Sequence, residues 1–156
     1  MRISVCAVGR LRAGPEKDLI DDYLARFDRT GRALGLGPAR IIEVEDKKNA
    51  GMGAEDALLR KAIPKGGLIC TLDERGRTLT SPEFAQRLGN WRDAGRQDVA
   101  LVIGGADGID PGLRAAADFS LSFGKMVWPH MLVRVMLAEQ LYRAATILSG
   151  GPYHRV

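Results

Sequence analysis

The sequence predicts a single α/β domain, built on a mostly parallel sheet with helices on both faces. Short apolar, β-rich segments alternate along the chain with segments whose apolar residues recur at helical spacing, which is the pattern of βαβ units. The chain has 156 residues and contains neither an internal repeat nor an internal linker. We therefore expect residues 1–156 to form one domain of ordinary size with a hydrophobic core of its own.

The first half of the chain predicts three strands and two helices. After a β-rich segment, Leu19, Tyr23 and Phe27 follow at a spacing of four, which indicates an amphipathic helix beginning near Pro15. Glycines and Pro38 end this helix. The predicted strands cover 2–8, 39–44 and 67–72, with a polar loop at 45–53 and a second helix at 54–63, which Pro64 ends.

The second half predicts two further strands and three helices. Either Thr80 or Ser81 can cap a helix, and Pro82 suits its first turn. The other expected elements are strands at 98–103 and 119–123, a short helix starting at Asp110-Pro111 and a long helix at 130–148, which Gly150-Gly151-Pro152 ends.

The composition indicates which kind of partner the protein can bind and in which cellular compartment it works. The formal net charge is +4, which is compatible with a polyanionic partner such as nucleic acid. No apolar run approaches the roughly 20 residues of a membrane span, and the N-terminal apolar segment lacks a small-residue cleavage site. Cys6 and Cys70 lie in apolar runs and are expected to be buried free thiols. We therefore expect a cytoplasmic protein that does not contact the membrane.

Several common active sites are missing from the sequence. It contains no phosphate-binding G-x-x-x-x-G-K-[ST], no H-E-x-x-H and no G-x-S-x-G motif. The two cysteines and two histidines are not closely paired, so no metal site is expected. The first strand ends in Val8-Gly9-Arg10-Leu11, without the G-x-G-x-x-G fingerprint. This argues against a nicotinamide enzyme and against a Rossmann methyltransferase with its cofactor at that position.

Two glycine-bearing loops are the strongest candidates for a ligand site. Ligands of parallel α/β sheets bind at the carboxyl ends of strands, here the loops after Leu72, Ile103 and Phe123. Ile103 leads into Gly104-Gly105-Ala106-Asp107-Gly108, and Phe123 into Gly124-Lys125-Met126-Val127-Trp128-Pro129-His130. The first loop alone could be no more than a tight turn. Together the loops predict two walls of one pocket, whose backbone groups could read the edge of an adenine.

The last predicted helix has almost no polar face, so we expect both of its sides to be buried. In a chain of this size, the second side is best covered by another subunit, which predicts a homodimer. The polar exceptions are Arg134, Glu139, Gln140 and Arg143. Glu139 and Arg143 stand four apart and could form a helix-stabilising pair. Alternatively, the arginines could hold a phosphate or position a nucleotide.

The C-terminal tail allows two interpretations. Tyr153, His154 and Arg155 could form a frayed end, as terminal residues often do. They also place a ring for stacking, a titratable imidazole and a phosphate-binding guanidinium within three positions.

Taken in order, these motifs resemble the RlmH family, SPOUT-class methyltransferases of pseudouridine N3 in 23S rRNA. The resemblance covers the whole chain and depends on Leu101 to Gly108, Gly124 to His130, Arg134, Glu139 to Ala144 and Pro152 to Arg155. It implies a SPOUT fold with a C-terminal trefoil knot, S-adenosyl-L-methionine as cofactor, and a homodimer whose site uses both subunits. It also implies action on the assembled ribosome.

The resemblance implies roles for individual residues. The cofactor-binding positions are Leu72, Gly105, Gly124, Lys125, Met126, Val127, Trp128 and Pro129. Tyr153, His154 and Arg155 match the tail associated with catalysis and substrate, and we expect Arg134 and Arg143 to contact the RNA. His154 is our first candidate for accepting the N3 proton, because imidazole titrates near neutrality. Glu139 is the second candidate. We expect His130 to be structural, for example as a cap of the last helix, and a direct role in the reaction is the alternative.

Two other functions are compatible with these features. One is a related knotted methyltransferase that acts on a ribose hydroxyl or a tRNA base. The other is a ribosome-binding protein that kept the fold and lost the methyl donor. The intact Gly104-Gly105 loop and the intact tail argue against the second alternative.

Overall fold

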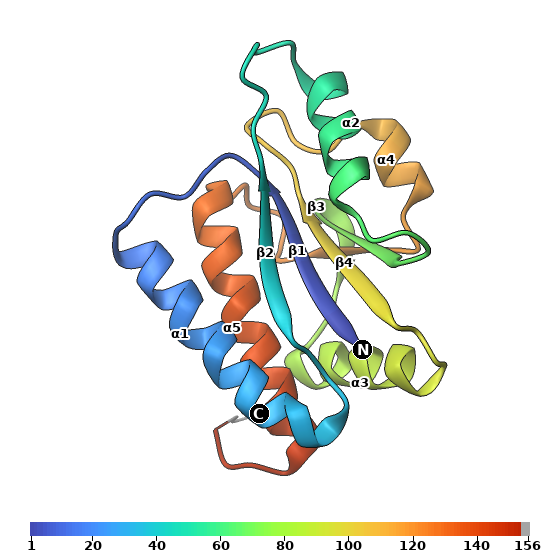
Figure 1. Ribbon diagram of the computed structural model, residues 1–156. Coiled ribbons are helices and arrows are strands. Elements are labelled where there is room, and N and C mark those ends of the chain that lie inside the picture. The colour runs from blue at the N-terminus through green and yellow to red at the C-terminus, as the bar shows by residue number, and fades with distance from the viewer. Residues whose placement is uncertain (154–156) are drawn as a thin grey trace.

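The chain forms a five-stranded parallel sheet between two layers of helices (Figure 1), as seen in a computed structural model that describes residues 1–153. The strands are β1 (Arg2–Val8), β2 (Ala39–Val44), β3 (Leu68–Thr78), β4 (Asp98–Ile103) and β5 (Phe119–Ser122), in the spatial order β2-β1-β4-β3-β5. The helices are α1 (Pro15–Gly31), α2 (Met52–Ala62), α3 (Ser81–Asp93), α4 (Pro111–Ala116) and α5 (His130–Ser149), with a 3₁₀ turn at Arg32–Leu34. All strand pairs are parallel, which confirms the predicted sheet.

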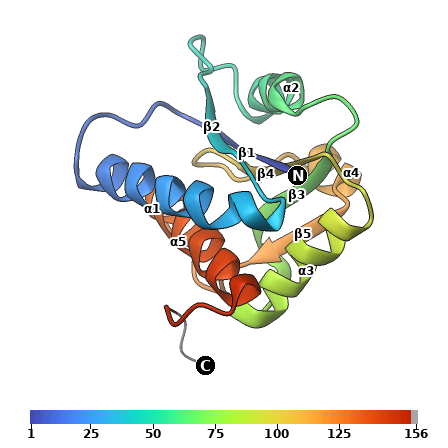
Figure 2. The same ribbon diagram turned by 60° about the horizontal axis from the view of Figure 1, so that its bottom comes forward.

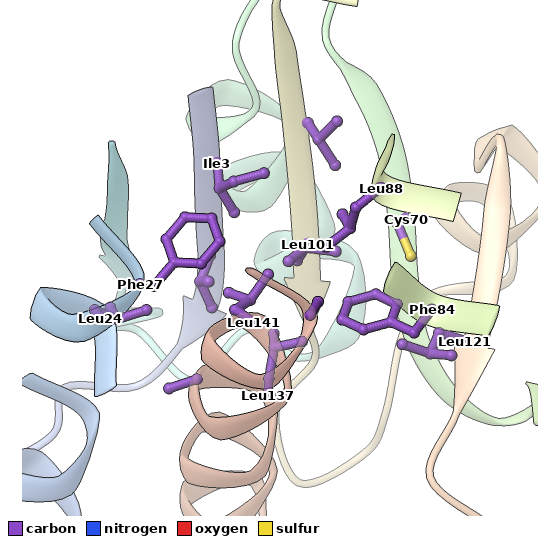
Figure 3. Close-up of a cluster of buried hydrophobic side chains, with 14 of the residues drawn as sticks. Ile3, Leu24, Phe27, Cys70, Phe84, Leu88, Leu101, Leu121, Leu137 and Leu141 are labelled. Atoms are coloured by element: carbon purple, nitrogen blue, oxygen red, sulfur yellow. The ribbon is translucent and has the colours of Figure 1, made fainter. Parts of the chain in front are cut away.

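Helices cover both faces of the sheet, as predicted. Figure 2 shows α1, α3 and α5 on one side of the strands and α2 and α4 on the other. The alternation along β1 explains this arrangement: Ile3 and Val5 point into the larger core, whereas Cys6 and Val8 point into the smaller one. Figure 3 shows the larger core, where side chains of the sheet meet those of α1, α3 and α5.

The two cysteines lie in different cores, and both are fully buried free thiols, as expected. Burial raises the pKa of Cys6 to about 11 and that of Cys70 to about 12. Both side chains are therefore neutral packing groups at physiological pH.

Strand β3 is longer than its sequence predicts. Its apolar part ends at Leu72, but the strand continues to Thr78 and pairs again with β5 after an irregular register between Leu72 and Arg77. The inserted residues 73–76 are polar and carry no strand pattern, so the predicted end at 72 is wrong. Helix α2 likewise begins at Met52, two residues before its predicted start.

Helix α5 follows its prediction closely but is buried unevenly. Leu137 and Leu141 are fully buried against the other helices and the sheet (Figure 3), whereas Met131 and Leu132 are about 40% exposed. Pro129 occupies the N-cap position and no side chain caps the helix, so the expected capping by His130 is wrong.

Two further features concern the chain as a whole. No helix within residues 1–153 is both long and apolar enough to cross a membrane. The trefoil knot implied by the resemblance stays a prediction, as does the assignment of all 156 residues to one domain.

Candidate functional site

A cavity of about 620 Å³ lies at the carboxyl ends of β3, β4 and β5. Its walls come from the ends of these strands, from the loop after β4 and from the segment between β5 and α5. The lining residues are Leu72 to Arg75, Ile103 to Ile109, Leu121, Phe123, Gly124, Met126 to His130 and Val133. The two glycine-bearing loops therefore lie together, as predicted from their positions after neighbouring strands.

Most of the residues predicted to bind the cofactor lie in this cavity. Leu72, Gly105 and Gly124 line it, together with Met126 to Pro129. Lys125 belongs to the same segment but is not among the lining residues. The roles of these residues remain predictions, but the fold has brought together side chains that the sequence separates by more than 50 positions.

The loop from Gly104 to Gly108 is closed by its own backbone. A Cβ atom on Gly104 would lie 2.6 Å from the carbonyl carbon and oxygen of Gly108. The Gly108 N–H donates to the Gly105 carbonyl at 3.0 Å, and Gly108 itself has φ of +84°. Buried Ile103 and Ile109 hold the two ends of the loop. Only glycine therefore fits at position 104.

Helix α2 supports this loop from behind through Glu55. A Cβ atom on Gly105 would lie 2.9 Å from Glu55 Oε2, so the carboxyl group packs directly against the glycine. Glu55 Oε2 is buried and has no hydrogen-bond partner among the described residues. Burial raises the pKa of this carboxyl group, and the charges of Asp107 and Asp46 add to the shift.

The opposite wall, between β5 and α5, is open and apolar. The chain leaves β5 through Gly124, which has φ of +111°, and a Cβ atom added there would meet nothing within 4 Å. Beyond it, Met126 and Val127 are 72% and 82% exposed, and Trp128 is 40% exposed. Large apolar side chains therefore stand around a cavity without being covered.

A third part of the wall was missed by the sequence analysis, namely the polar segment inserted in β3. Asp73 is nearly buried, accepts from the Arg75 N–H at 2.8 Å and pairs with Arg114 at 3.4 Å. Asp73, Glu74 and Arg75 all line the cavity. The available signal was a run of polar residues directly after an apolar strand, at the sheet edge where ligands bind.

Arg134 does not reach solvent. It is 2% exposed and donates to the carbonyls of Val8 at 2.7 Å and Gly9 at 2.8 Å, and to Glu43 at 3.0 Å. This arginine joins α5 to the ends of β1 and β2, a geometry that favours a structural role over the expected RNA contact. Burial, followed by the Arg134 charge, lowers the pKa of neighbouring His130, which is therefore neutral at pH 7.

The tail residue Tyr153 lies farther along α5, beside Glu139 and Arg143. Glu139 accepts from Arg143 Nη2 at 2.6 Å and from the Tyr153 hydroxyl at 3.2 Å, while the Arg143 guanidinium lies 5.1 Å from the tyrosine ring centroid. The Glu139–Arg143 pair predicted from the helical spacing is therefore present. Burial and the Glu139 charge raise the pKa of Tyr153 to about 12. His154 and Arg155 lie outside the described residues.

Within a single chain, Tyr153 does not lie at the glycine-lined cavity. None of Glu139, Arg143 and Tyr153 lines that cavity. Glu139 instead borders a second, apolar cavity of about 590 Å³ between α1, α3 and α5. At a rise of roughly 1.5 Å per residue, Glu139 lies about 14 Å along α5 from His130. Within residues 1–153, no three His, Cys, Asp or Glu side chains are grouped to hold a metal.

Comparison with known proteins gives strong matches over the full chain. A family model described as "Predicted SPOUT methyltransferase" matches residues 1–154. A protein of a Ruegeria species named "Ribosomal RNA large subunit methyltransferase H" is 80% identical over 156 residues, covering 100% of both chains. A protein of the same name from Ruegeria pomeroyi is 81% identical, again over 100% of both chains.

Two solved structures share the fold at low sequence identity. A probable methyltransferase from Bordetella pertussis matches with a TM-score of 0.53 and 17% identity, covering 92% of this chain and 96% of that one. A probable methylase family protein from Haemophilus influenzae matches with a TM-score of 0.51 and 12% identity, covering 99% of this chain and 70% of that one.

Proposed function

The chain belongs to the SPOUT methyltransferase family, and from this premise we propose that it methylates N3 of a pseudouridine in 23S rRNA on the assembled ribosome. The names of the full-length relatives support large-subunit ribosomal RNA as the substrate. The observation that carries the proposal is the cavity in which the Gly104–Gly108 loop faces the apolar segment from Gly124 to Pro129. Such a reaction would take place in the bacterial cytoplasm, where ribosomes are assembled.

S-adenosylmethionine, the methyl donor of this family, fits the chemistry of the cavity. The volume of about 620 Å³ lies within the range of ligand pockets. The main-chain groups of the Gly104–Gly108 loop could contact an adenine edge, and Trp128 and Val133 offer apolar surface. Asp73, Glu74 and Asp107 outnumber Arg75 among the charged lining residues, which suits a cationic ligand. When bound, the donor supplies a methyl group on a positively charged sulfur.

The protein must also remove a proton from the acceptor nitrogen and align that nitrogen with the methyl group. We retain His154 as first candidate for the proton acceptor. Glu139 is the weaker candidate, because Gln140, Arg143 and Tyr153 already donate four hydrogen bonds to its carboxylate. The Tyr153 hydroxyl keeps its proton at neutral pH, so this side chain is suited to stacking and to holding the tail on α5.

A homodimer accounts for the separation between tail and cavity. Leu19 on α1 and Met131 and Leu132 on α5 are all 40% exposed or more, although they are large apolar residues. A second copy packed on this face would bury them and could bring its own tail to the first copy's cavity. Sedimentation velocity should give a dimer at micromolar concentration, and Leu132→Asp should shift it toward monomer. A stable wild-type monomer would contradict this proposal.

The two arginines expected to contact RNA are not equally suited to that contact. Arg143 retains about a quarter of its side-chain exposure while it pairs with Glu139, so it can still present an edge to a phosphate. Arg134 is buried and would have to abandon three hydrogen bonds. We therefore propose Arg143 as the RNA contact and Arg134 as a support of the cavity wall.

The function is tested by methyl transfer to assembled ribosomes from a strain that lacks the corresponding activity. We expect incorporation into ribosomes with pseudouridylated RNA and none into ribosomes with unmodified uridine, with the methylated nucleoside identified by mass spectrometry. A methylated ribose or a methylated tRNA base would support the related knotted methyltransferases instead. Failure of the purified protein to bind S-adenosylmethionine in calorimetry would support a ribosome-binding protein without activity.

The assignment of His154 needs a separate measurement. His154→Ala should lower the single-turnover rate with saturating substrate, and the rate should lose its dependence on the ionisation of an imidazole. A variant that keeps the full rate would eliminate His154 as the proton acceptor.

A further inference from the structure

We propose that Ser122 is a positioning residue of the donor cavity. Its buried hydroxyl joins the polar segment 73–76 to the turn at Gly124 and so holds one side of the cavity in shape. The inference rests on the proposed function, since it takes the ligand of the cavity to be S-adenosylmethionine. Ser122 itself is not among the lining residues, so its effect on the ligand is indirect.

Ser122 is the last residue of β5 and is 4% exposed. Its Oγ lies 2.9 Å from the Gly124 carbonyl oxygen, 3.2 Å from the Glu74 carbonyl oxygen and 3.1 Å from the Gly124 nitrogen. A serine hydroxyl has one proton to donate and two lone pairs to accept with. It can therefore accept from the Gly124 N–H while donating to the Glu74 carbonyl, and this arrangement joins the two segments. All three partners are main-chain groups of residues that line the cavity.

The path of the main chain explains why a side-chain hydrogen bond is needed at this position. Residues 73–76 leave the regular pairing of β3 with β5, so no continuous ladder of hydrogen bonds holds them. Their last residue nevertheless lies close against β5, because a Cβ atom on Gly76 would lie 2.6 Å from the Ser120 carbonyl oxygen. At the same place the chain turns away from β5 through Gly124, with φ of +111°. Two irregular segments, 48 positions apart in sequence, thus converge on one hydroxyl.

Loss of this hydroxyl should make the walls of the cavity less rigid before any ligand binds. Without it, the Gly124 N–H and a carbonyl lose a partner in a nearly buried place, and segment 73–76 loses a contact to the turn. Glu74 and Gly124 would then sample positions farther apart. Binding would have to restore their arrangement, and that cost appears as weaker affinity.

The same strand offers a matched control. Ser120 precedes Ser122 by two positions, accepts a hydrogen bond from Thr71 Oγ1 at 3.0 Å and does not line the cavity. Ser122→Ala and Ser120→Ala each remove one hydroxyl from β5. In calorimetry with S-adenosylmethionine at one protein concentration, we expect Ser122→Ala to raise Kd about tenfold, the effect of one lost hydrogen bond. Ser120→Ala should change Kd less than about twofold.

A second readout does not depend on the ligand. The Gly124 N–H is held by Ser122 Oγ, so its hydrogen exchange in the ligand-free protein should become faster in Ser122→Ala and remain unchanged in Ser120→Ala. Ser122→Cys keeps a side chain that can donate and accept, although it is somewhat larger and a weaker donor, and its Kd should fall between those of wild type and Ser122→Ala. This variant keeps the test valid if the alanine variant is too unstable to purify.

The outcomes separate the two proposals. If the wild-type protein does not bind S-adenosylmethionine, the proposed function fails. If wild type binds and Ser122→Ala binds equally well, the function stands and the role of Ser122 is wrong. Equal weakening by both serine variants would also overturn that role, because it would show a general effect on β5.

Discussion

The two glycine-bearing walls of the cavity differ in how they are held. The Gly104–Gly108 loop is bound by its own backbone, anchored by buried isoleucines and backed by Glu55. The segment from Gly124 to Pro129 makes few such contacts and exposes Met126 and Val127 almost fully. One wall is thus preformed in the single chain, whereas the other is left for a ligand or a second copy to cover. This division suits a site that must hold its donor firmly and still admit a large RNA.

The preformed wall should tolerate no side chain at its tightest point. Gly104→Ala places a Cβ atom 2.6 Å from backbone atoms of Gly108, so the loop must shift. We expect Kd for S-adenosylmethionine to rise about a hundredfold, or ~3 kcal/mol, in calorimetry. Gly53→Ala is the control, because a Cβ atom there meets nothing within 4 Å. Unchanged binding by Gly104→Ala would mean that the loop is not a rigid wall.

The open wall depends on where α5 begins, and Arg134 holds that point. Arg134→Met removes the three hydrogen bonds of a buried guanidinium and should lower the free energy of unfolding by about 3 kcal/mol. The measurement is urea denaturation at fixed protein concentration. Lys17→Met breaks an exposed pair with Asp21 and should leave the free energy of unfolding almost unchanged. Similar small losses in both variants would refute the structural role of Arg134.

The exposed side chains of the open wall should matter for binding but not for folding. Val127 is 82% exposed, so Val127→Ser should change the free energy of unfolding of the ligand-free protein by less than about 0.5 kcal/mol. We expect Kd for S-adenosylmethionine to rise several-fold, up to about tenfold, through lost apolar contact. A large loss of stability would show instead that this wall is already packed in the ligand-free protein.

The smallest expected effect is the pH dependence contributed by His130, where the open wall joins α5. Its pKa is lowered in the folded protein, so the unfolded chain binds the proton more readily. Stability should therefore fall as the pH drops below the ordinary histidine pKa of about 6.5. Relative to His130→Gln, wild type should lose a further few tenths of a kcal/mol between pH 7.5 and 5.5. Parallel stability profiles would assign the pH dependence to other groups.

Much of the fold follows from local patterns in the sequence. The alternation along β1, the helical spacing from Leu19 to Phe27 and the caps at Thr80 and Asp110 set elements that appear within a few residues of their predicted bounds. The alternation of strands and helices predicted the parallel sheet. The two glycine-bearing loops were expected to lie together because both follow strands whose carboxyl ends share one edge of such a sheet. The resemblance to a known family added the proposed reaction and the residues of the tail.

Other features could not be read from the chain. The continuation of β3 through residues 73–76 has no strand pattern and exists because β5, about 45 positions later, lies beside it. Arg134 was expected to contact RNA, but it is buried and donates to the carbonyls of Val8 and Gly9, which lie at the end of β1. Ser122 gave no signal, since its partners are main-chain groups of distant segments.

For the cavity walls, the sequence by itself determined which residues are glycine and which are apolar, and therefore where the chain could turn and where it could bind. Only the tertiary structure decided that the Gly104 loop is rigid and the Gly124 segment open. The physical reason is that rigidity comes from neighbours supplied by other elements: Glu55 and buried isoleucines hold one wall, whereas the other depends on the single hydroxyl of Ser122 and on whatever covers it.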